Sequence, residues 1–168
     1  MQAKIIERAA FRLVGFSFFG DPFRSYAGWS EENEIGRLWK RWMAYLESEQ
    51  PDLPYVQPAN VMYEVFIYHP ETLQTGEFEV FAGIEVAEFG DLPPKVVAKM
   101  LPACRYAVFT LAGHEIVSDW EFQLDAEWLP DLGLERSTDF SIQRYDVRFK
   151  GMDAVDESEL DVLIPLLP

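Results

Sequence analysis

The spacing of apolar residues in the first half of the chain limits the folds that are open to it. Branched and aromatic residues predict a strand at 10–19. Apolar residues three and four apart then predict a helix at 31–48, for which Ser30 is the expected N-cap. Two further strands are predicted at 61–68 and 78–86, joined by a turn. The first half is therefore expected to form a strand, a helix and a hairpin.

The second half of the chain follows a related order. Its predicted elements are two strands, a helix that opens at a glycine and stops before a proline, and two final strands, at residues 96–101, 105–111, 113–128, 139–149 and 159–166. The stretch Ala10-Phe11-Arg12-Leu13 also resembles Ala103-Cys104-Arg105-Tyr106, at an offset of 93 residues. The order and the match together indicate an internal duplication, with halves at about 1–92 and 93–168.

Two such halves predict a single domain over residues 1–168, of the α+β class. Their duplicated strand-helix-strand-strand units would pair into an antiparallel sheet with both helices on one face. The other face is then left as a groove along the pseudo-twofold axis, and clefts between similar halves are common ligand sites. We therefore expect a small molecule to bind on the face that the helices leave open.

The strand at 78–86 supplies the charged residue that we expect in this groove. Its even-numbered residues are all apolar, which predicts that this face packs beneath the helices. Phe81, Gly83 and Glu85 point the other way, and Gly83 would leave room for a close approach. Glu85 is therefore the predicted ligand anchor. The alternative is a carboxylate that simply faces water.

Aromatic residues are frequent, with 13 Phe, 7 Tyr and 5 Trp, and some of them are expected to wall the groove. Tyrosine suits such a wall because it combines an apolar ring with a polar tip. The tryptophans at helical spacing fit packing better than binding, although two of them could reach the groove from the helices. The predicted wall residues, on strands and near helix ends, are Tyr63, Phe81, Tyr106, Tyr145, Trp39 and Trp120.

An acid among aromatic rings favours a hydrophobic, cationic guest, since each ring attracts a cation by roughly 0.5–2 kcal/mol. The formal net charge of −15 opposes direct binding of nucleic acid. Two histidines and one cysteine offer no metal cage, and no phosphate-binding loop occurs, so we expect no metal and no cofactor. Without a signal peptide or a membrane-spanning run, a cytoplasmic protein that does not bind membranes is expected.

Several segments, in a fixed order, resemble the GyrI-like family, which includes the effector-binding domains of AraC-type and MerR-type transcription activators. Residues 76–86 resemble its G-E-F…G-V-E-V pattern, residues 102–109 resemble I-P-A-G-x-Y-A-V-F, and residues 144–146 resemble the end of E-R-Y-D. Further matches lie at 10–15, 35–39 and 128–133. Together these segments span almost the whole chain.

The resemblance implies a bacterial protein whose ligand groove carries an acidic anchor, and it places Glu85 on the Glu of the G-V-E-V pattern. Gln143 stands where the Glu of E-R-Y-D is usual, which weakens the case for a doubly charged guest. No helix-turn-helix region precedes residue 10. The resemblance therefore implies a stand-alone member, related to multidrug binding and transcription regulation, rather than a complete activator.

The known activities of the family leave three functions open. A binding module is favoured, in which Glu85, Gln143 and the aromatic walls hold the guest. If the chain is an enzyme, it is expected to be a hydrolase of cyclopropane-bearing genotoxins, with Glu85 as general base and Tyr106 at the leaving group. A protective protein would instead bind a protein partner, such as DNA gyrase or a regulator. Turnover of a cyclopropane substrate separates the enzyme from the binding module.

Overall fold

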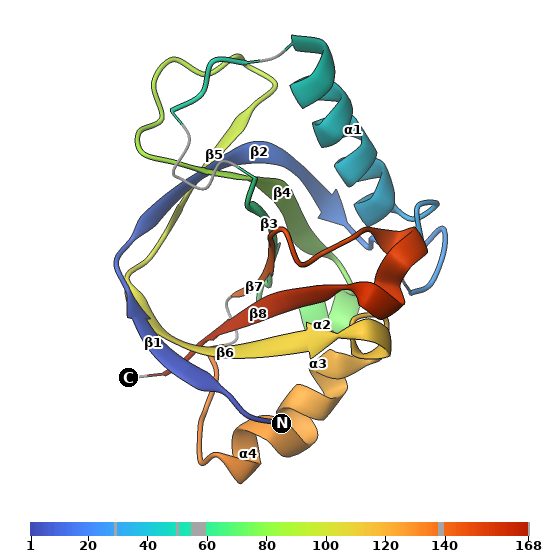
Figure 1. Cartoon of the computed structure of the whole chain (residues 1–168), viewed down its shortest axis with the longest axis vertical. Coiled ribbons are helices and arrows are strands. Elements are labelled where there is room, and N and C mark those ends of the chain that lie inside the picture. Colours follow the sequence, from blue (N-terminus) through green and yellow to red (C-terminus); the bar gives the residue numbers. More distant parts are fainter. Residues whose placement is uncertain (29, 50, 55–59, 138–139, 168) are drawn as a thin grey trace.

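The computed structural model describes residues 1–28, 30–49, 51–54, 60–137 and 140–167. Its eight strands form one antiparallel sheet, which confirms the predicted α+β class (Figure 1). The strands are β1 (Lys4–Arg8), β2 (Phe11–Gly20), β3 (Met62–Ile67), β4 (Phe78–Val86), β5 (Val97–Leu101), β6 (Cys104–Ala112), β7 (Phe140–Tyr145) and β8 (Glu159–Pro165). The helical segments are α1 (Glu34–Glu49), α2 (Thr72–Thr75), η1 (Gly113–Glu115), α3 (Trp120–Gln123), η2 (Leu124–Trp128), α4 (Leu129–Asp131) and η3 (Met152–Glu157).

The strand order β1-β6-β8-β7-β3-β4-β2-β5 is symmetric about the β7–β3 pair. Exchanging β1 with β5, β2 with β6, β3 with β7 and β4 with β8 reproduces the same order in reverse. Each half also places its first strand at the edge of the other half, since β1 pairs with β6 and β5 pairs with β2. This is the sheet expected of two duplicated units, and the boundary between them near residue 92 stays a prediction.

The helices pack on one face of the sheet, above two apolar clusters. Leu38 and Trp42 of α1 are fully buried against residues of β2 and β4. The apolar residues predicted on the second helix, at 116, 120, 124 and 128, are buried against β6 and β8. Figure 1 accordingly shows α1 beside β2 and β4, and the segment from α3 to α4 beside β6. No helix in the described part of the chain is both long and apolar enough to cross a bilayer.

A third apolar cluster fills the opposite, concave face of the sheet. It contains Leu13, Val65 and Phe81 from the first half and Tyr106 and Ile142 from the second, all at most 1% exposed. The strong curvature of the sheet brings these strands around a common centre (Figure 1). The face that the helices leave open is therefore largely a packed core, and only part of it is left as a cavity.

Several predicted boundaries move in the structure. α1 begins at Glu34 because the side chain of Asn33, rather than that of Ser30, accepts the Gly36 N–H at 2.9 Å. The second helix does not open at Gly113, whose positive φ ends β6 and leads into a single short turn. It begins at Trp120 instead and continues through Pro130 to Asp131, because Pro130 lies at the start of a new segment.

The strand predicted at 139–149 is shorter than expected, and its first residue lies outside the described residues. β7 ends at Tyr145 because the Asp146 carboxylate accepts the Arg148 N–H at 3.0 Å, which closes a tight turn. One strand, β1, has no counterpart among the predicted elements. Its sequence, Lys4 to Arg8, mixes charged and apolar residues at an edge of the sheet.

Candidate functional site

A cavity of about 810 Å³ lies between α1 and α3, on the face of the sheet that the helices cover. Its floor is formed by alternate residues of β3 and β7, which project toward the helices. Its walls come from both helices and from neighbouring loops. The residues that matter most for its chemistry are Trp39, Trp120, Glu121, Met62, Glu64, Phe66, Gln143 and Tyr145.

Glu64 stands at the centre of the floor and is only 3% exposed. The indole Nε1 of Trp39 donates a hydrogen bond to one of its carboxylate oxygens. The Gln143 amide, directly opposite it in the register of β3 and β7, donates to the other oxygen at 2.8 Å. The Tyr145 hydroxyl in turn donates to the Gln143 carbonyl at 3.2 Å. Both halves of the chain therefore hold this carboxylate.

The ionised form of Glu64 is disfavoured in this position. Burial raises the pKa of Glu64 to about 7, and the nearby Glu121 carboxylate adds to the increase. The hydrogen bond from Trp39 acts in the opposite direction but is outweighed. Glu64 can therefore change its charge near neutral pH when a cation arrives.

Glu121 provides a second acid in the wall of the same cavity. It accepts a hydrogen bond from the Tyr68 hydroxyl at 2.7 Å, and burial raises its pKa as well. Within the described residues, neither Glu64 nor Glu121 forms an ion pair. Lys40, the cation that lines the cavity, is paired with Glu31 at 2.7 Å.

Aromatic rings stand close to these acids. The Trp39 and Tyr145 rings meet edge to face, with centroids 5.3 Å apart. The centroids of the Tyr145 and Phe149 rings are 4.9 Å apart. A buried acid such as Glu64, with no ion-pair partner among the described residues and next to electron-rich rings, forms a site that attracts a hydrophobic cation. The cavity volume lies within the range of about 300–1,000 Å³ that is usual for small-molecule sites.

The structure does not bring the eight predicted ligand residues into one groove. Trp39, Trp120, Gln143 and Tyr145 line the cavity between the helices. Glu85 and Tyr63 line a second cavity of about 590 Å³, on the opposite face of the sheet. Phe81 and Tyr106 line neither cavity, because both side chains are fully buried in the cluster on the concave face.

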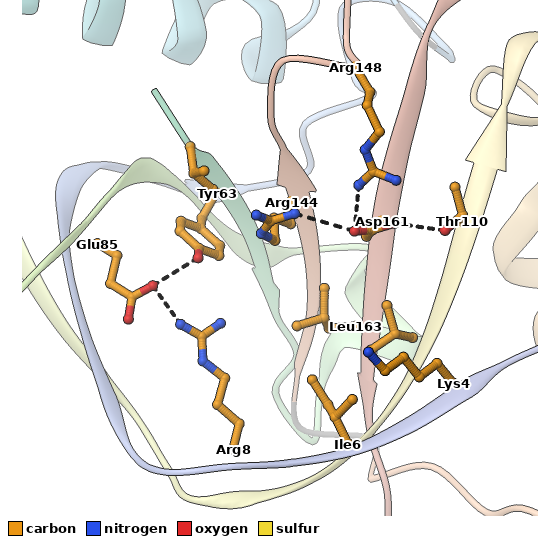
Figure 2. Close-up of a pocket in the computed structure, with 12 residues that line it drawn as sticks. Lys4, Ile6, Arg8, Tyr63, Glu85, Thr110, Arg144, Arg148, Asp161 and Leu163 are labelled. Carbon is orange, nitrogen blue, oxygen red and sulfur yellow. Dashed lines mark hydrogen bonds and ion pairs between the residues drawn. The ribbon is translucent and has the colours of Figure 1, made fainter. Parts of the chain in front are cut away.

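Glu85 itself is already neutralised by the protein. An Arg8 guanidinium nitrogen lies 2.5 Å from its carboxylate, and the Tyr63 hydroxyl donates to the same oxygen at 2.8 Å (Figure 2). The space that Gly83 was expected to leave is filled as well. A Cβ at this position would lie 2.2 Å from the Val14 carbonyl oxygen and 2.7 Å from the Phe81 ring.

Glu85 and Tyr106, the two residues proposed for catalysis, do not lie in one cavity, because Tyr106 is buried in the apolar cluster. The Tyr106 hydroxyl points to the Pro102 carbonyl at 3.5 Å, and burial raises the pKa of Tyr106. Glu85 and Tyr106 therefore do not face a shared space in which a substrate could meet both.

Glu64 and Glu121 were missed by the sequence analysis, although the first left a signal. Glu64 is the single charged residue in the apolar run 61–68 and alternates with Met62 and Phe66. Pairing this strand with 78–86 in a hairpin places Glu64 opposite Ala82, on the face already assigned to the helices. Glu121 had no comparable signal, since it is one of many acids on predicted helices.

Comparison with known proteins gives both a family and a fold. The GyrI-like small molecule binding domain matches residues 1–167. The transcriptional regulator BrlR of Pseudomonas aeruginosa is 32% identical over 168 residues, which is 99% of this chain and 56% of that protein. The chain therefore spans about half the length of this curated relative.

Two solved structures share the fold at low sequence identity. SAV2435 bound to tetraphenylphosphonium has a TM-score of 0.69 and 14% identity, with 99% of this chain and 94% of that chain covered. EcmrR, in a cryo-electron microscopy complex with DNA, has a TM-score of 0.67 and 16% identity, with 98% and 57% covered. At such identities these structures show the fold alone.

Proposed function

The chain belongs to the GyrI-like small-molecule-binding domain family, and we propose that it binds a hydrophobic cation in the cavity between α1 and α3. The observation that carries this proposal is Glu64, a buried carboxylate with no ion-pair partner among the described residues. A guest with a positive charge would supply the missing partner and favour the ionised form.

The surroundings of Glu64 support a guest that is also large and apolar. Trp39 and Tyr145 stand beside the carboxylate, and Trp120, Met62 and Phe66 extend the apolar lining. Glu121 adds a second negative site in the wall. SAV2435, which has this fold, is bound to tetraphenylphosphonium, a cation of this kind. Tetraphenylphosphonium is therefore a suitable test ligand for this chain.

The experiment is a calorimetric titration of tetraphenylphosphonium into wild-type protein and two matched variants, at a pH above the pKa of Glu64. Glu64→Gln should weaken binding by about tenfold to hundredfold, because the desolvated charge partner is lost. Glu85→Gln, the same change in the other cavity, should leave the affinity unchanged. Circular dichroism of each variant would check that the fold is retained.

Three results would contradict the proposal. One is equal affinity of wild type and Glu64→Gln for the cation. Another is a loss confined to Glu85→Gln, which would move the cation to the cavity on the opposite face. The third is that tetraphenylphosphonium does not bind wild type at all, which would count against a cationic guest.

A role in regulation follows from the relatives as a further part of the proposal. BrlR is a transcriptional regulator, and EcmrR is found in a complex with DNA. We propose that binding of a guest in the cavity is a signal that another protein region or partner reads. An interaction with DNA gyrase stays a prediction of the family resemblance.

A further inference from the structure

The second cavity, of about 590 Å³, is built from regular strands on the concave face of the sheet (Figure 2). Thr110, Asp161, Arg144 and Tyr63 form a single row across β6, β8, β7 and β3, because the register pairs each residue with the next. Side chains in such a row point to the same side of the sheet. The polar wall of this cavity is therefore fixed by the sheet itself.

The charge of this lining differs from that of the chain as a whole. Four cations line the cavity, namely Lys4, Arg8, Arg144 and Arg148, together with two carboxylates, those of Glu85 and Asp161. Asp146 also pairs with Arg144 and Arg148, and Glu159 lies 3.6 Å from Arg148, but neither of these two carboxylates lines the cavity. Among the lining residues, cations therefore outnumber carboxylates by two, although the chain carries a formal net charge of −15.

The carboxylates in this cavity are already occupied by donors of the protein. Asp161 accepts hydrogen bonds from Thr110 at 2.8 Å and from Arg148 at 2.6 Å, and Arg144 also contacts it, at 3.3 Å. Glu85 is bound by Arg8 and Tyr63. A cationic guest would have to displace a guanidinium from one of these carboxylates, which makes such a guest unfavourable.

Two of the cations, Arg8 and Lys4, in contrast keep unused donors. Arg8 donates to Glu85 through one of its three guanidinium nitrogens, and a guanidinium carries five N–H groups. Lys4 forms no ion pair within the described residues, and its ammonium group has three donors. Lys4 is therefore the lining cation that has no carboxylate partner among the described residues.

Apolar side chains complete the lining and define the rest of the guest. Ile6, Val61, Val108 and Leu163 lie among the charged residues. Lys4 pairs with Val108 and Val108 with Leu163 in the sheet register, so a charged group and an apolar wall share one row. We propose that this cavity is a second ligand site, which binds a small organic monocarboxylate with an apolar body.

The test is an NMR titration with hexanoate and benzoate, as aliphatic and aromatic monocarboxylates. Hexanamide and hexylammonium serve as neutral and cationic controls. Saturable shifts are expected at Val108, Thr110 and Leu163 with the carboxylates, and at least about tenfold weaker binding of hexanamide. Stronger binding of benzoate or of hexanoate would show which body the cavity prefers.

Two variants in this cavity should change the affinity in opposite directions. Lys4→Gln should weaken carboxylate binding by about fivefold, because the unpaired positive charge of an exposed side chain is removed. Glu85→Gln should strengthen it a few-fold, because Arg8 loses its carboxylate partner. Lys95→Gln is the matched control, since this exposed lysine pairs with Glu49 and lines neither cavity.

The proposal is overturned if neither carboxylate gives saturable shifts in this cavity, if hexanamide binds as well as hexanoate, or if Lys4→Gln binds like wild type. These results are independent of the cation site. Tetraphenylphosphonium is expected to shift resonances of Met62 and Tyr145, on the other face, so either site can fail while the other stands.

Discussion

The two cavities lie on opposite faces of the same pair of strands, β3 and β7, and the carboxylates in them have different partners. Tyr63 and Glu64 are neighbours in β3, and Gln143 and Arg144 are neighbours in β7, yet each pair is divided between the two faces. On the concave face every lining carboxylate is bound by an arginine. On the helix face, the donors that hold Glu64 within the described part of the chain are neutral, from Trp39 and Gln143.

Because of this difference, we expect the carboxylates on the concave face to stabilise the fold and Glu64 to serve ligand binding. A carboxylate paired with guanidinium groups is satisfied within the protein, and removing it leaves cations without partners. A buried carboxylate held by neutral donors costs stability when it is ionised, but it is ready to pair with a charged guest. We therefore expect substitutions on the two faces to have opposite effects on the free protein.

The largest expected effect is a loss of stability in Asp161→Asn. Asp161 has a side chain only 15% exposed and is contacted by Thr110, Arg144 and Arg148. Its neutralisation should lower the free energy of unfolding by about 2–4 kcal/mol, measured by urea denaturation. The exposed Asp153→Asn is the control and should change the free energy by less than about 0.5 kcal/mol. Equal losses of unfolding free energy in Asp161→Asn and Asp153→Asn would contradict the stabilising role of Asp161.

A smaller effect of opposite sign is expected for Glu64→Gln above neutral pH. Because the pKa of Glu64 is raised from 4.5 to about 7 on folding, the native state holds this proton more tightly than the unfolded state. Stability should therefore fall as the pH rises from about 4.5 to about 7 and stay low above it. The variant lacks this penalty and should be more stable than wild type at pH 8.

The free energy of unfolding of Glu64→Gln at pH 8 is expected to exceed that of wild type by roughly 1–3 kcal/mol. The gain is less than the whole penalty of ionising Glu64, because the glutamine side chain has one acceptor oxygen where two donors converge. It should vanish when the pH is below 4.5, where both states of wild type hold the proton. Urea denaturation at several pH values measures the difference. A gain that does not depend on pH would mean that the charge of Glu64 is not its cause.

The smallest effect concerns the pH dependence of cation binding. With a pKa of about 7, Glu64 is mostly protonated at pH 6 and mostly ionised at pH 8. The affinity for tetraphenylphosphonium should therefore rise by about tenfold over this range, with release of a proton. Titrations in buffers of different ionisation enthalpy would detect that proton, and Glu64→Gln should show neither signal.

The sequence was sufficient for most of the fold. The strand at 78–86 was predicted to the residue, because its alternating pattern is uninterrupted. The duplicated order of elements predicted a sheet with both helices on one face. β1 was missed because its charged residues mask the pattern of a strand. Both helices begin later than predicted. Asn33 and Asp119, rather than Ser30 and Gly113, are the residues that precede their first turns.

The site could be predicted only in part. Trp39, Trp120, Gln143 and Tyr145 were identified as ligand residues, and they do line one cavity. Glu64 was missed because the ligand site was expected on the face that the helices leave open, whereas Glu64 lies in a cavity on the face that they cover. Arg8, 77 residues away in the chain, neutralises Glu85, and no local pattern predicts such a contact. Asp161 lies in a predicted strand, but its contacts with Arg144 and Arg148 were likewise not predicted.

The exchange of β1 and β5 between the halves has a consequence for how the protein can be divided. A fragment that ends near residue 92 would contain β1 without β6, β2 without β5 and β3 without β7, so three strands would lose a hydrogen-bonded neighbour. A chain of half this length could close its sheet only by recruiting a second copy. Joining both halves in one chain makes each cavity complete in a single molecule, so its occupancy does not depend on protein concentration.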